Sequence, residues 1–350
     1  MAEQPYITAL IDTYNHERFI AEAIDSVLAQ DFPASEMEIL VVDDGSTDST
    51  PEIVRLYADR VRYIRKENGG QASALNLGFA EARGEIVAML DGDDVWLPTK
   101  ISRVAAEFAK EPEAVVVCHP YITWLCDQNI EIEDQTFHPV RGKMPLGQED
   151  LLRYGDYGTC GMALRREAAS SFLPIPESLK IYADTYIIFV AVFAGGVVGL
   201  NECLTKYRYH DSNLASFREQ DKGKAERRWR CYSSAVEEGK KWLVRQGHDV
   251  SRPEVAAFVK RHELVEQMLR YYCAPPGRAE YFRHLRDLQR LYQPLWTRRY
   301  RAFHTLLSLA GFVLGYERFV ALRERYRGSR LSVRARESLL PVSGQEAALP

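Results

Sequence analysis

Two clusters of acidic residues follow apolar runs in the first third of the chain. Residues 43–46 read Asp-Asp-Gly-Ser and follow the run 38–42, and residues 91–94 read Asp-Gly-Asp-Asp and follow the run 85–90. Short apolar, β-branched runs are typical of buried strands in a parallel sheet. In open sheets of this kind the ligand binds beyond the carboxyl ends of the strands, so we expect these carboxylates to meet there. Clustered carboxylates repel a diphosphate unless a hard cation lies between them. The pattern therefore predicts Mg²⁺ or Mn²⁺ and a nucleotide diphosphate.

The elements that must position these clusters alternate in type along the N-terminal third. This βαβ alternation predicts an α/β fold with a doubly wound, mostly parallel sheet. Beyond about residue 120 the pattern loosens into loops and short elements, and from Gln220 onward it is mostly helical. The expected strands are 6–11, 38–42, 61–66, 85–90 and 114–118, and the expected helices are 19–30, 50–58, 69–82 and 98–110.

Composition excludes several classes of protein. The 350 residues carry a net charge of −4, so nothing in the overall charge favours a nucleic-acid partner. The six cysteines are scattered and form no C-x-x-C pair, which favours reduced thiols in a cytoplasmic setting over a disulfide framework or a zinc site. Residues 1–5 have neither a basic nor an apolar region of a leader, so we expect no signal peptide.

The positive charge is concentrated near the C-terminus. Residues 296–336 contain ten arginines, no lysine and two acidic residues, a formal charge of +8. The apolar stretch 303–320 inside this segment is interrupted by polar residues, and its purely apolar part is too short to span a bilayer, which needs about 20 residues. An arginine-flanked apolar helix could lie on an anionic membrane, as a peripheral contact at the inner face. The alternative is a helix docked on the N-terminal domain with its arginines in water.

Six segments occur in an order and spacing that resemble a known family. They are residues 14–15 (Tyr-Asn), 26–30 (Ser-Val-Leu-Ala-Gln), 42–48 (Val-Asp-Asp-Gly-Ser-Thr-Asp), 68–70 (Asn-Gly-Gly), 74–76 (Ala-Leu-Asn) and 91–94 (Asp-Gly-Asp-Asp). Together they resemble the family 2 glycosyltransferases, an inverting group with a GT-A fold. The resemblance implies transfer of one sugar from a nucleotide-diphosphate sugar, UDP- or dTDP-linked, to an acceptor hydroxyl with a Mn or Mg divalent cation. Its setting would be the biosynthesis of a surface glycan, glycolipid or polysaccharide.

The resemblance also divides the chain. Residues 1–118 are expected to form the nucleotide-sugar-binding half of a GT-A domain, and residues 119–215 its acceptor-binding half. Residues 216–336 would be a helical C-terminal extension, and residues 337–350 a disordered tail.

Donor binding is expected to involve six residues, one of which, Asp91, belongs to the second acidic cluster. A carboxylate at Asp44 can accept a hydrogen bond from the imide N–H of a uracil-like base, and the resemblance gives its counterpart that role. Asp43 would brace the following turn or contact the ribose, and Tyr14 would lie near the base. Thr13 and Gly70 complete the donor side. The alternative is that the two aspartates only cap the turn.

Metal binding is expected at the second cluster. The resemblance implies that Asp93 is the metal ligand and that Asp91 meets the ribose, a metal-bound water or the metal. His210, in a Tyr-Arg-Tyr-His segment, would lie near the metal and the diphosphate. The alternatives are a solvated turn and a calcium loop, although glycine comes too early in 91–94 for an EF-hand.

Inverting transfer needs a carboxylate that deprotonates the acceptor hydroxyl, and Asp184 is the candidate. It precedes the apolar run 187–194. The family often has a second acidic residue just before this aspartate, and here that position is Ala183. The alternative role for Asp184 is a helix N-cap. Thr159, Cys160 and Trp96 are expected on the acceptor side.

Other functions fit the sequence less well. An oxidoreductase would need G-x-G-x-x-G after the first strand, and a sugar-nucleotide pyrophosphorylase a Gly-rich, Lys/Arg-bearing loop at the same place. Neither is present at residues 12–17. A catalytically inactive GT-A scaffold stays open. Processive synthases carry Q-x-x-R-W, whereas residues 225–229 read Ala-Glu-Arg-Arg-Trp, which favours single addition. Asp12 stands where many relatives have proline or threonine.

Overall fold

The computed structural model describes residues 5–133, 139–142, 146–153, 157–210, 213, 222–296 and 298–327. The chain forms two compact units. Unit 1 comprises Met1–Leu146, Gly155–Arg218 and Ser234–His248, and unit 2 comprises Gly147–Tyr154, Glu219–Ser233 and Asp249–Pro350. The boundary falls inside the long helix α8 (Lys222–Arg245). The expected tail 337–350 and residues 328–336 of the arginine-rich segment lie outside the described residues.

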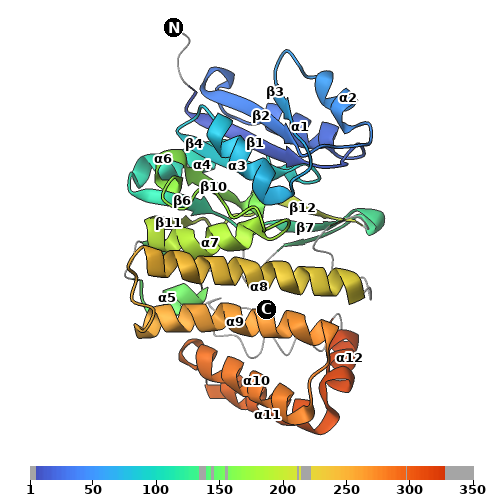
Figure 1. Cartoon of the computed structure of the whole chain (residues 1–350), viewed down its shortest axis with the longest axis vertical. Helices are drawn as coiled ribbons and strands as arrows, with labels where there is room; N and C mark the ends of the chain where they lie inside the picture. The colour runs from blue at the N-terminus through green and yellow to red at the C-terminus, as the bar shows by residue number, and fades with distance from the viewer. Residues whose placement is uncertain are drawn as a thin grey trace. The chain divides into compact units, whose positions relative to one another are not determined.

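Unit 1 is built on an eight-stranded sheet with helices on its two faces (Figure 1). The mixed α/β fold with a mostly parallel sheet that the sequence predicts is confirmed. β10 and β9 are the exceptions, because β10 runs antiparallel to both of its neighbours and the edge strand β9 runs antiparallel to β11. In spatial order the strands are β3 (Arg62–Arg65), β2 (Met37–Asp43), β1 (Ile7–Thr13), β4 (Ile86–Asp91), β10 (Met162–Arg165), β6 (Ala114–Cys118), β11 (Gly196–Gly199) and β9 (Arg141–Gly142).

The central strands are apolar on both sides because helices cover both faces of the sheet. Alternate residues of β1, such as Ile7 and Ile11, belong to one core with α1 (Ile20–Leu28) and α4 (Lys100–Lys110). Leu10 points to the opposite face and meets α3 (Gln71–Glu81). There Gly78 lies so close that a Cβ atom would be 2.4 Å from Leu10 Cδ1. The remaining helices of unit 1 are α2 (Thr50–Arg55), α6 (Arg166–Ala169) and α7 (Ala183–Ala194).

A second, four-stranded sheet includes part of the stretch for which the sequence predicts loops and short elements. β12 lies between β5 and β7, and β8 pairs with the outer side of β7. The two pairings of β12 join segments more than 80 residues apart, such as Lys206 with Ile122, and local patterns do not reveal them. The strands are β5 (Val95–Trp96), β12 (Thr205–Tyr209), β7 (Ile122–Leu125) and β8 (Ile130–Glu133).

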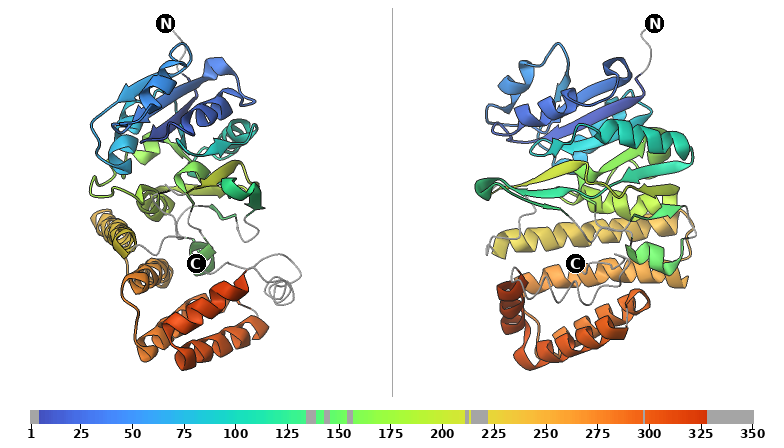
Figure 2. Two further views of the ribbon diagram at one scale, coloured as in Figure 1. Left: turned by 90° about the vertical axis from the view of Figure 1, so that its right-hand side faces the viewer. Right: turned by 180° about the vertical axis from the view of Figure 1, so that it is seen from behind.

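Unit 2 is helical, as the sequence predicts for the C-terminal region. Two views show α10 and α11 lying side by side (Figure 2). Aromatic side chains from α9, α10 and α12, including Tyr271 and Tyr281, form a small core of this unit. In the described part of the chain, we find no helix with the length and apolar character needed to cross a membrane. Its helices are α5 (Gln148–Arg153), α9 (Pro253–Cys273), α10 (Arg278–Tyr292), α11 (Arg298–Leu314) and α12 (Tyr316–Arg327).

Candidate functional site

The carboxyl ends of β1, β2 and β4 bring the two acidic clusters together. The parallel register pairs Thr13 with Asp43 and Asp12 with Asp91. β1 lies between the other two strands, so the clusters lie on either side of its end. The two acidic clusters therefore meet at one edge of the sheet, as the strand pattern predicts.

Asp44 is held rigidly just beyond β2. Its backbone N–H donates to the carbonyl of Thr13 at 2.9 Å. Its Oδ1 accepts from the N–H of Gly69 at 2.9 Å and the ammonium of Lys66 at 2.8 Å, and its Oδ2 accepts from the N–H of Gly70 at 2.6 Å. Gly70 has φ +89°, a conformation that favours glycine. Since each carboxylate oxygen can accept two hydrogen bonds, Oδ2 can accept a further donor.

Asp43 is fully buried and braces the turn that follows it. Its Oδ1 accepts from the N–H of Ser46 at 2.8 Å, and its Oδ2 accepts from the hydroxyl of Tyr63 at 2.6 Å. The guanidinium of Arg65 lies 3.6 Å from Oδ2. These contacts favour the bracing role over direct contact with a ribose.

Asp93 faces two imidazoles. His210 Nε2 lies 3.0 Å from Asp93 Oδ2, and His16 Nε2 lies 3.7 Å from the same oxygen. The amide of Asn213 donates to that oxygen at 3.3 Å. Burial acts to raise the pKa of Asp93, but the facing imidazoles of His16 and His210 outweigh it and lower the pKa. The structure thus brings together Asp93 and His210, the pair that the resemblance placed at the metal.

Asp12 and Asp91 form a pair of carboxyls that repel each other strongly. Burial, followed by the charge of Asp93, raises the pKa of Asp12 to about 8. Burial, followed by the charge of Asp12, raises the pKa of Asp91 well above its ordinary value. Asp12 Oδ1 is buried and has no hydrogen-bond partner among the described residues. Repulsion and an unpartnered oxygen both indicate a place that would accommodate a cation.

Buried side chains next to Asp91 form another possible set of metal ligands. One ligand atom each from Asp91, Asp94 and Cys160 lie within 4.8 Å of one another, a set that could hold a metal ion. Asp94 and Cys160 are fully buried, however, and burial raises the pKa of both groups. Lys100 is also fully buried. It donates to the carbonyl of Cys160 at 2.6 Å, and its ammonium lies 4.2 Å from the centroid of the Trp96 ring. The ammonium of Lys100 beside Asp94 and Cys160 would repel a cation there, which favours Asp91, Asp93 and His210 as the predicted cation ligands.

The three residues expected on the acceptor side have little exposed surface. Trp96 and Thr159 are each 2% exposed and Cys160 is fully buried, so their contact with an acceptor stays a prediction. Thr159 is also buried and accepts a hydrogen bond from Gln71 Nε2 at 3.1 Å. The same Gln71 nitrogen donates to Asp91 Oδ1 at 3.1 Å. Thr159 therefore acts on the acidic cluster through Gln71.

Asp184 belongs to the same electrostatic cluster. Its charge contributes to the raised pKa values of both Asp12 and Asp91. It is the second residue of α7 and not the N-cap, which is Tyr182. Its Oδ1 accepts from the N–H of Thr185 at 2.7 Å. Tyr182 has φ +64°, a left-handed conformation that is costly for a bulky residue and that often occurs at functional sites.

The remaining predicted donor residues lie at the end of β1. Tyr14 is exposed, whereas Thr13 is buried with its Oγ1 3.2 Å from His16 Nδ1. Sequence reasoning assigned no role to five residues that contact or face the predicted ones: Asp12, His16, Lys66, Gln71 and Asn213. Only Asp12 carried a local signal, as a charged residue at the end of an otherwise apolar strand.

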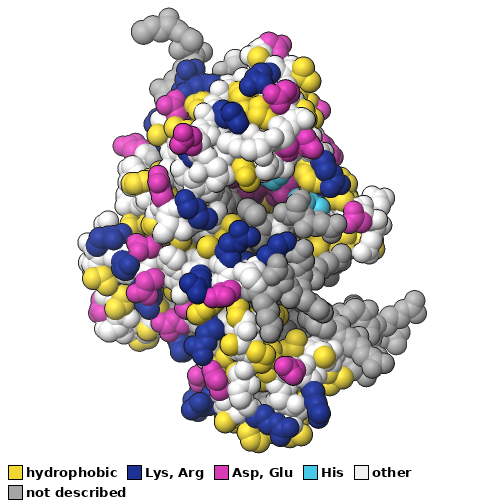
Figure 3. Space-filling view, turned by 45° about the vertical axis from the view of Figure 1, so that its right-hand side comes forward, with side chains coloured by type: hydrophobic (Ala, Val, Ile, Leu, Met, Phe, Trp, Pro, Cys, Tyr) yellow, Lys and Arg dark blue, Asp and Glu magenta, His cyan; other side chains and the backbone are white. Residues whose placement is uncertain are grey.

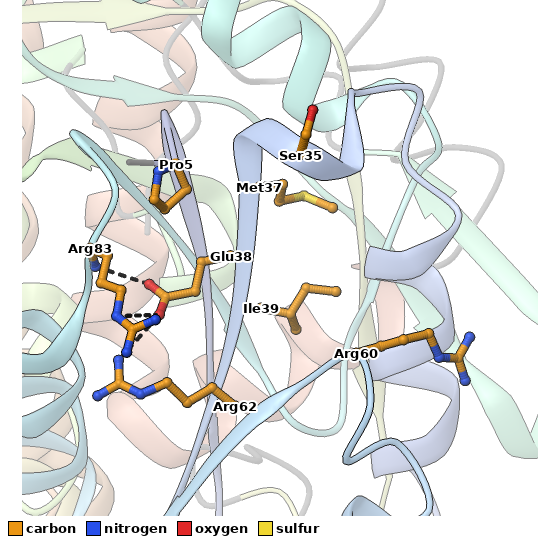
Figure 4. A pocket seen from close by; sticks show the side chains of 8 residues that line it. All are labelled: Pro5, Ser35, Met37, Glu38, Ile39, Arg60, Arg62 and Arg83. Carbon is orange, nitrogen blue, oxygen red and sulfur yellow. Dashed lines mark hydrogen bonds and ion pairs between the residues drawn. The ribbon is translucent and has the colours of Figure 1, made fainter. Parts of the chain in front are cut away.

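A separate pocket lies at the opposite ends of the same strands. It is lined by Glu38 at the start of β2, Arg62 at the start of β3 and Arg83 just before β4. Glu38 faces Arg62 and Arg83 and pairs with both, whereas Arg60 points away (Figure 4). The pocket lacks the paired aspartates, so it is not the candidate site.

Comparisons with known proteins agree with this geometry. Residues 8–172 match the family model described as glycosyl transferase family 2. An uncharacterized glycosyltransferase of Nostoc is 37% identical over 220 residues, which are 59% of this chain and 66% of that relative's length. One of Rickettsia typhi is 27% identical over 75% of this chain and 82% of the relative. Residues 8–172 therefore form a family 2 glycosyltransferase domain, and the chain is a glycosyltransferase.

Two solved structures share the fold. Residues 1–349 of TarS from S. aureus, in complex with UDP, superpose with a TM-score of 0.58 at 19% identity, covering 92% of this chain and 91% of that one. The mannosyltransferase PcManGT from Pyrobaculum calidifontis, in complex with GDP-Man and Mn²⁺, gives a TM-score of 0.51 at 18% identity, with coverages of 93% and 89%. At these identities the likeness establishes the GT-A fold.

Proposed function

We propose that this enzyme transfers one sugar from a UDP- or dTDP-linked donor to an acceptor hydroxyl, with inversion at the anomeric carbon. The observation that carries the proposal is the convergence of Asp44, Asp91, Asp93 and Asp184 on the carboxyl ends of three parallel strands. Such a displacement needs a carboxylate beside the nucleobase, a pair of residues that binds a cation, and a further carboxylate that takes a proton. This site would supply all three.

Asp44 would read the base of the donor. Lys66, Gly69 and Gly70 fix its carboxylate in one orientation, and Oδ2 can accept one more hydrogen bond. The imide N–H of uracil or thymine is a donor that matches this acceptor. A carboxylate therefore favours UDP and dTDP, and Tyr14 at the exposed rim would lie beside the base.

The residues at the second cluster fit a hard divalent cation, Mn²⁺ or Mg²⁺. Asp91, Asp93 and His210 would hold it, and the unpartnered Oδ1 of Asp12 lies in the same repelling group of carboxyls. When bound, such an ion would stabilise the negative charge of the departing diphosphate. His16 would hold Asp93 in place from the side of β1.

Asp184 would act as the general base. Its carboxylate would take the proton of the acceptor hydroxyl while that oxygen bonds to the anomeric carbon. The bond from this carbon to the diphosphate oxygen then breaks, and the nucleoside diphosphate leaves with the electron pair. The placement of Asp184 within α7, and not at its cap, supports this role. The acceptor would be a hydroxyl of a glycan, of a lipid-linked molecule or of another compound.

Calorimetric titration tests the donor assignment directly. UDP and dTDP should bind at least about tenfold more tightly than GDP in the presence of Mn²⁺, equivalent to about 1.4 kcal/mol. Equal or stronger binding of GDP would remove the assignment of Asp44.

The same titrations test the metal. Chelation should weaken UDP binding, and Asp93→Asn should remove most of the affinity gained with Mn²⁺, because a neutral amide does not offset the charge of the ion. Asp31→Asn, an exposed change away from the site, is the matched control and should bind as the wild type does. Equal affinity with and without metal in the wild-type protein would contradict the metal assignment.

A further inference from the structure

Helix α11 of unit 2 has an outer face made of large apolar side chains. Leu306 and Val313 are each 66% exposed, Leu309 is 50% exposed, and Phe303 and Phe312 are 37% and 44% exposed. We call these five residues the α11 ridge. At 3.6 residues per turn Leu306, Leu309 and Val313 lie in the middle of this side. Phe303 and Phe312 lie at its two margins, where the ring of Phe312 is 5.4 Å from that of Phe282 on α10.

The opposite side of α11 is already packed. Gly311 lies so close to α10 that a Cβ atom would be 2.7 Å from Leu285 Cδ1, and Ser308 is 3% exposed. Gln289 Nε2 on α10 donates to Thr305 Oγ1 at 2.6 Å. Leu307, Ala310 and Leu314 pack on the small core that contains Tyr281 of α10, so α11 has apolar side chains on its packed side and also on the side that faces outward. A surface helix normally has a polar outer face, and contiguous exposed apolar side chains indicate a binding surface.

The charge around the ridge identifies its partner. Residues 278–327, which form α10 to α12, contain eleven arginines, no lysine and four acidic residues. Arg298 at the start of α11 and Arg318 on α12 are exposed. Figure 3 shows apolar side chains gathered on the helical unit with Lys and Arg side chains beside them. Two copies of this surface would bring net positive charge against net positive charge, whereas an anionic surface would neutralise it.

We propose that the α11 ridge docks this enzyme on an anionic membrane surface. Leu306, Leu309 and Val313 insert among the upper acyl chains, and α11 lies parallel to the bilayer. Arg298 and Arg318 remain at the depth of the lipid phosphates. Such docking combines apolar burial at the interface with attraction of the flanking arginines to anionic lipid. The proposal does not depend on which donor the active site takes.

Sedimentation of the full chain with lipid vesicles tests the proposal. The protein should bind vesicles of phosphatidylcholine with about 30% phosphatidylglycerol and should bind pure phosphatidylcholine at least about tenfold more weakly. The double change Leu306→Glu with Leu309→Glu should lower binding to the anionic vesicles by at least about tenfold, because two apolar side chains no longer insert. Leu56→Glu is the matched control. Leu56 is 78% exposed and lies outside the ridge, so its change should leave binding intact.

The contribution of charge has its own variant. Arg298→Gln with Arg318→Gln should weaken binding by roughly fivefold per arginine and reduce its sensitivity to salt. Circular dichroism verifies that each variant is folded, and Leu306→Gln with Leu309→Gln replaces the glutamate pair if that pair unfolds. Equal binding of the wild type to neutral and anionic vesicles would overturn the proposal, as would equal binding by the wild type and the folded ridge variant. Self-association that the ridge variant abolishes, without vesicle binding by the wild type, would assign the surface to a second copy instead.

Discussion

Individual side chains separate donor binding from proton removal in the proposed reaction. Asp184→Asn should leave the affinity for UDP nearly unchanged, since its carboxylate is assigned to the acceptor and not to the diphosphate. Turnover should fall by about 10² to 10⁴, the usual effect of losing a positioned base, or roughly 3–5 kcal/mol of barrier. Calorimetry and a glycosyl-transfer assay measure the two quantities separately.

The control for this prediction is Glu177→Gln, an exposed acidic residue in the segment before α7. It should retain wild-type transfer rates. A folded Asp184→Asn protein that transfers sugar at nearly the wild-type rate would mean that another carboxylate is the base, and Asp12 would be the next to change.

The turn after β2 is the element that fixes the donor side. Gly45 has φ +82°, and a Cβ atom there would lie 2.8 Å from the backbone nitrogen of Asn68. Gly247 has φ +75° but nothing within 4 Å of its added Cβ. Both glycines therefore have a left-handed backbone conformation, but only Gly45 lacks room for a Cβ atom.

Gly45→Ala and Gly247→Ala separate these two effects. Each should lose about 1–2 kcal/mol of unfolding free energy from the left-handed conformation. Gly45→Ala should lose more, because the backbone at residue 68 must shift, and UDP binding should weaken as Gly69 and Gly70 move away from Asp44. Urea unfolding and calorimetry are the measurements. Equal losses in the two variants would mean that the turn yields easily and does not position Asp44.

The stability of the protein should depend on a buried histidine of unit 2. His284 is 2% exposed, and its Nδ1 lies 2.9 Å from Gln267 Oε1. Burial lowers the pKa of His284 to about 4, below the unfolded value near 6.5. Between these values the unfolded chain binds the proton and the folded chain does not. This contribution is therefore complete above about pH 6.5 and is lost as the pH falls toward 4, by up to about 3 kcal/mol.

Unfolding curves of the wild type and His284→Gln at several pH values check this expectation. The variant should lose less stability than the wild type between pH 6.5 and 4, because glutamine does not titrate. His248→Gln is the comparison. Burial also lowers the pKa of His248, but this residue is only partly buried and should change the dependence less. A parallel pH dependence in wild type and His284→Gln would show that other groups control acid stability.

The strands and helices of the donor half can be predicted from the sequence alone. Apolar runs ending in Asp43 and Asp91 predict buried parallel strands, because each run must be covered on both faces. Parallel strands must in turn present their carboxyl ends at one edge. The six-segment resemblance adds the family, and the match over residues 8–172 confirms it. The roles of Asp44, Asp93, His210 and Asp184, and the division of the chain at residues 118 and 215, stay predictions.

Only the tertiary structure decided which side chains are accessible and which face each other. β10 enters the sheet antiparallel between β4 and β6, and β12 pairs with β7, although long stretches of chain separate these partners. Trp96 and Cys160 are sealed in the core by this packing, while Asp12 is brought opposite Asp91 and His16 opposite Asp93. Hydrophobic periodicity is a property of neighbouring residues, so it predicts strands and helices. Burial and repulsion between charges depend on distant segments meeting, and the chain must fold before they exist.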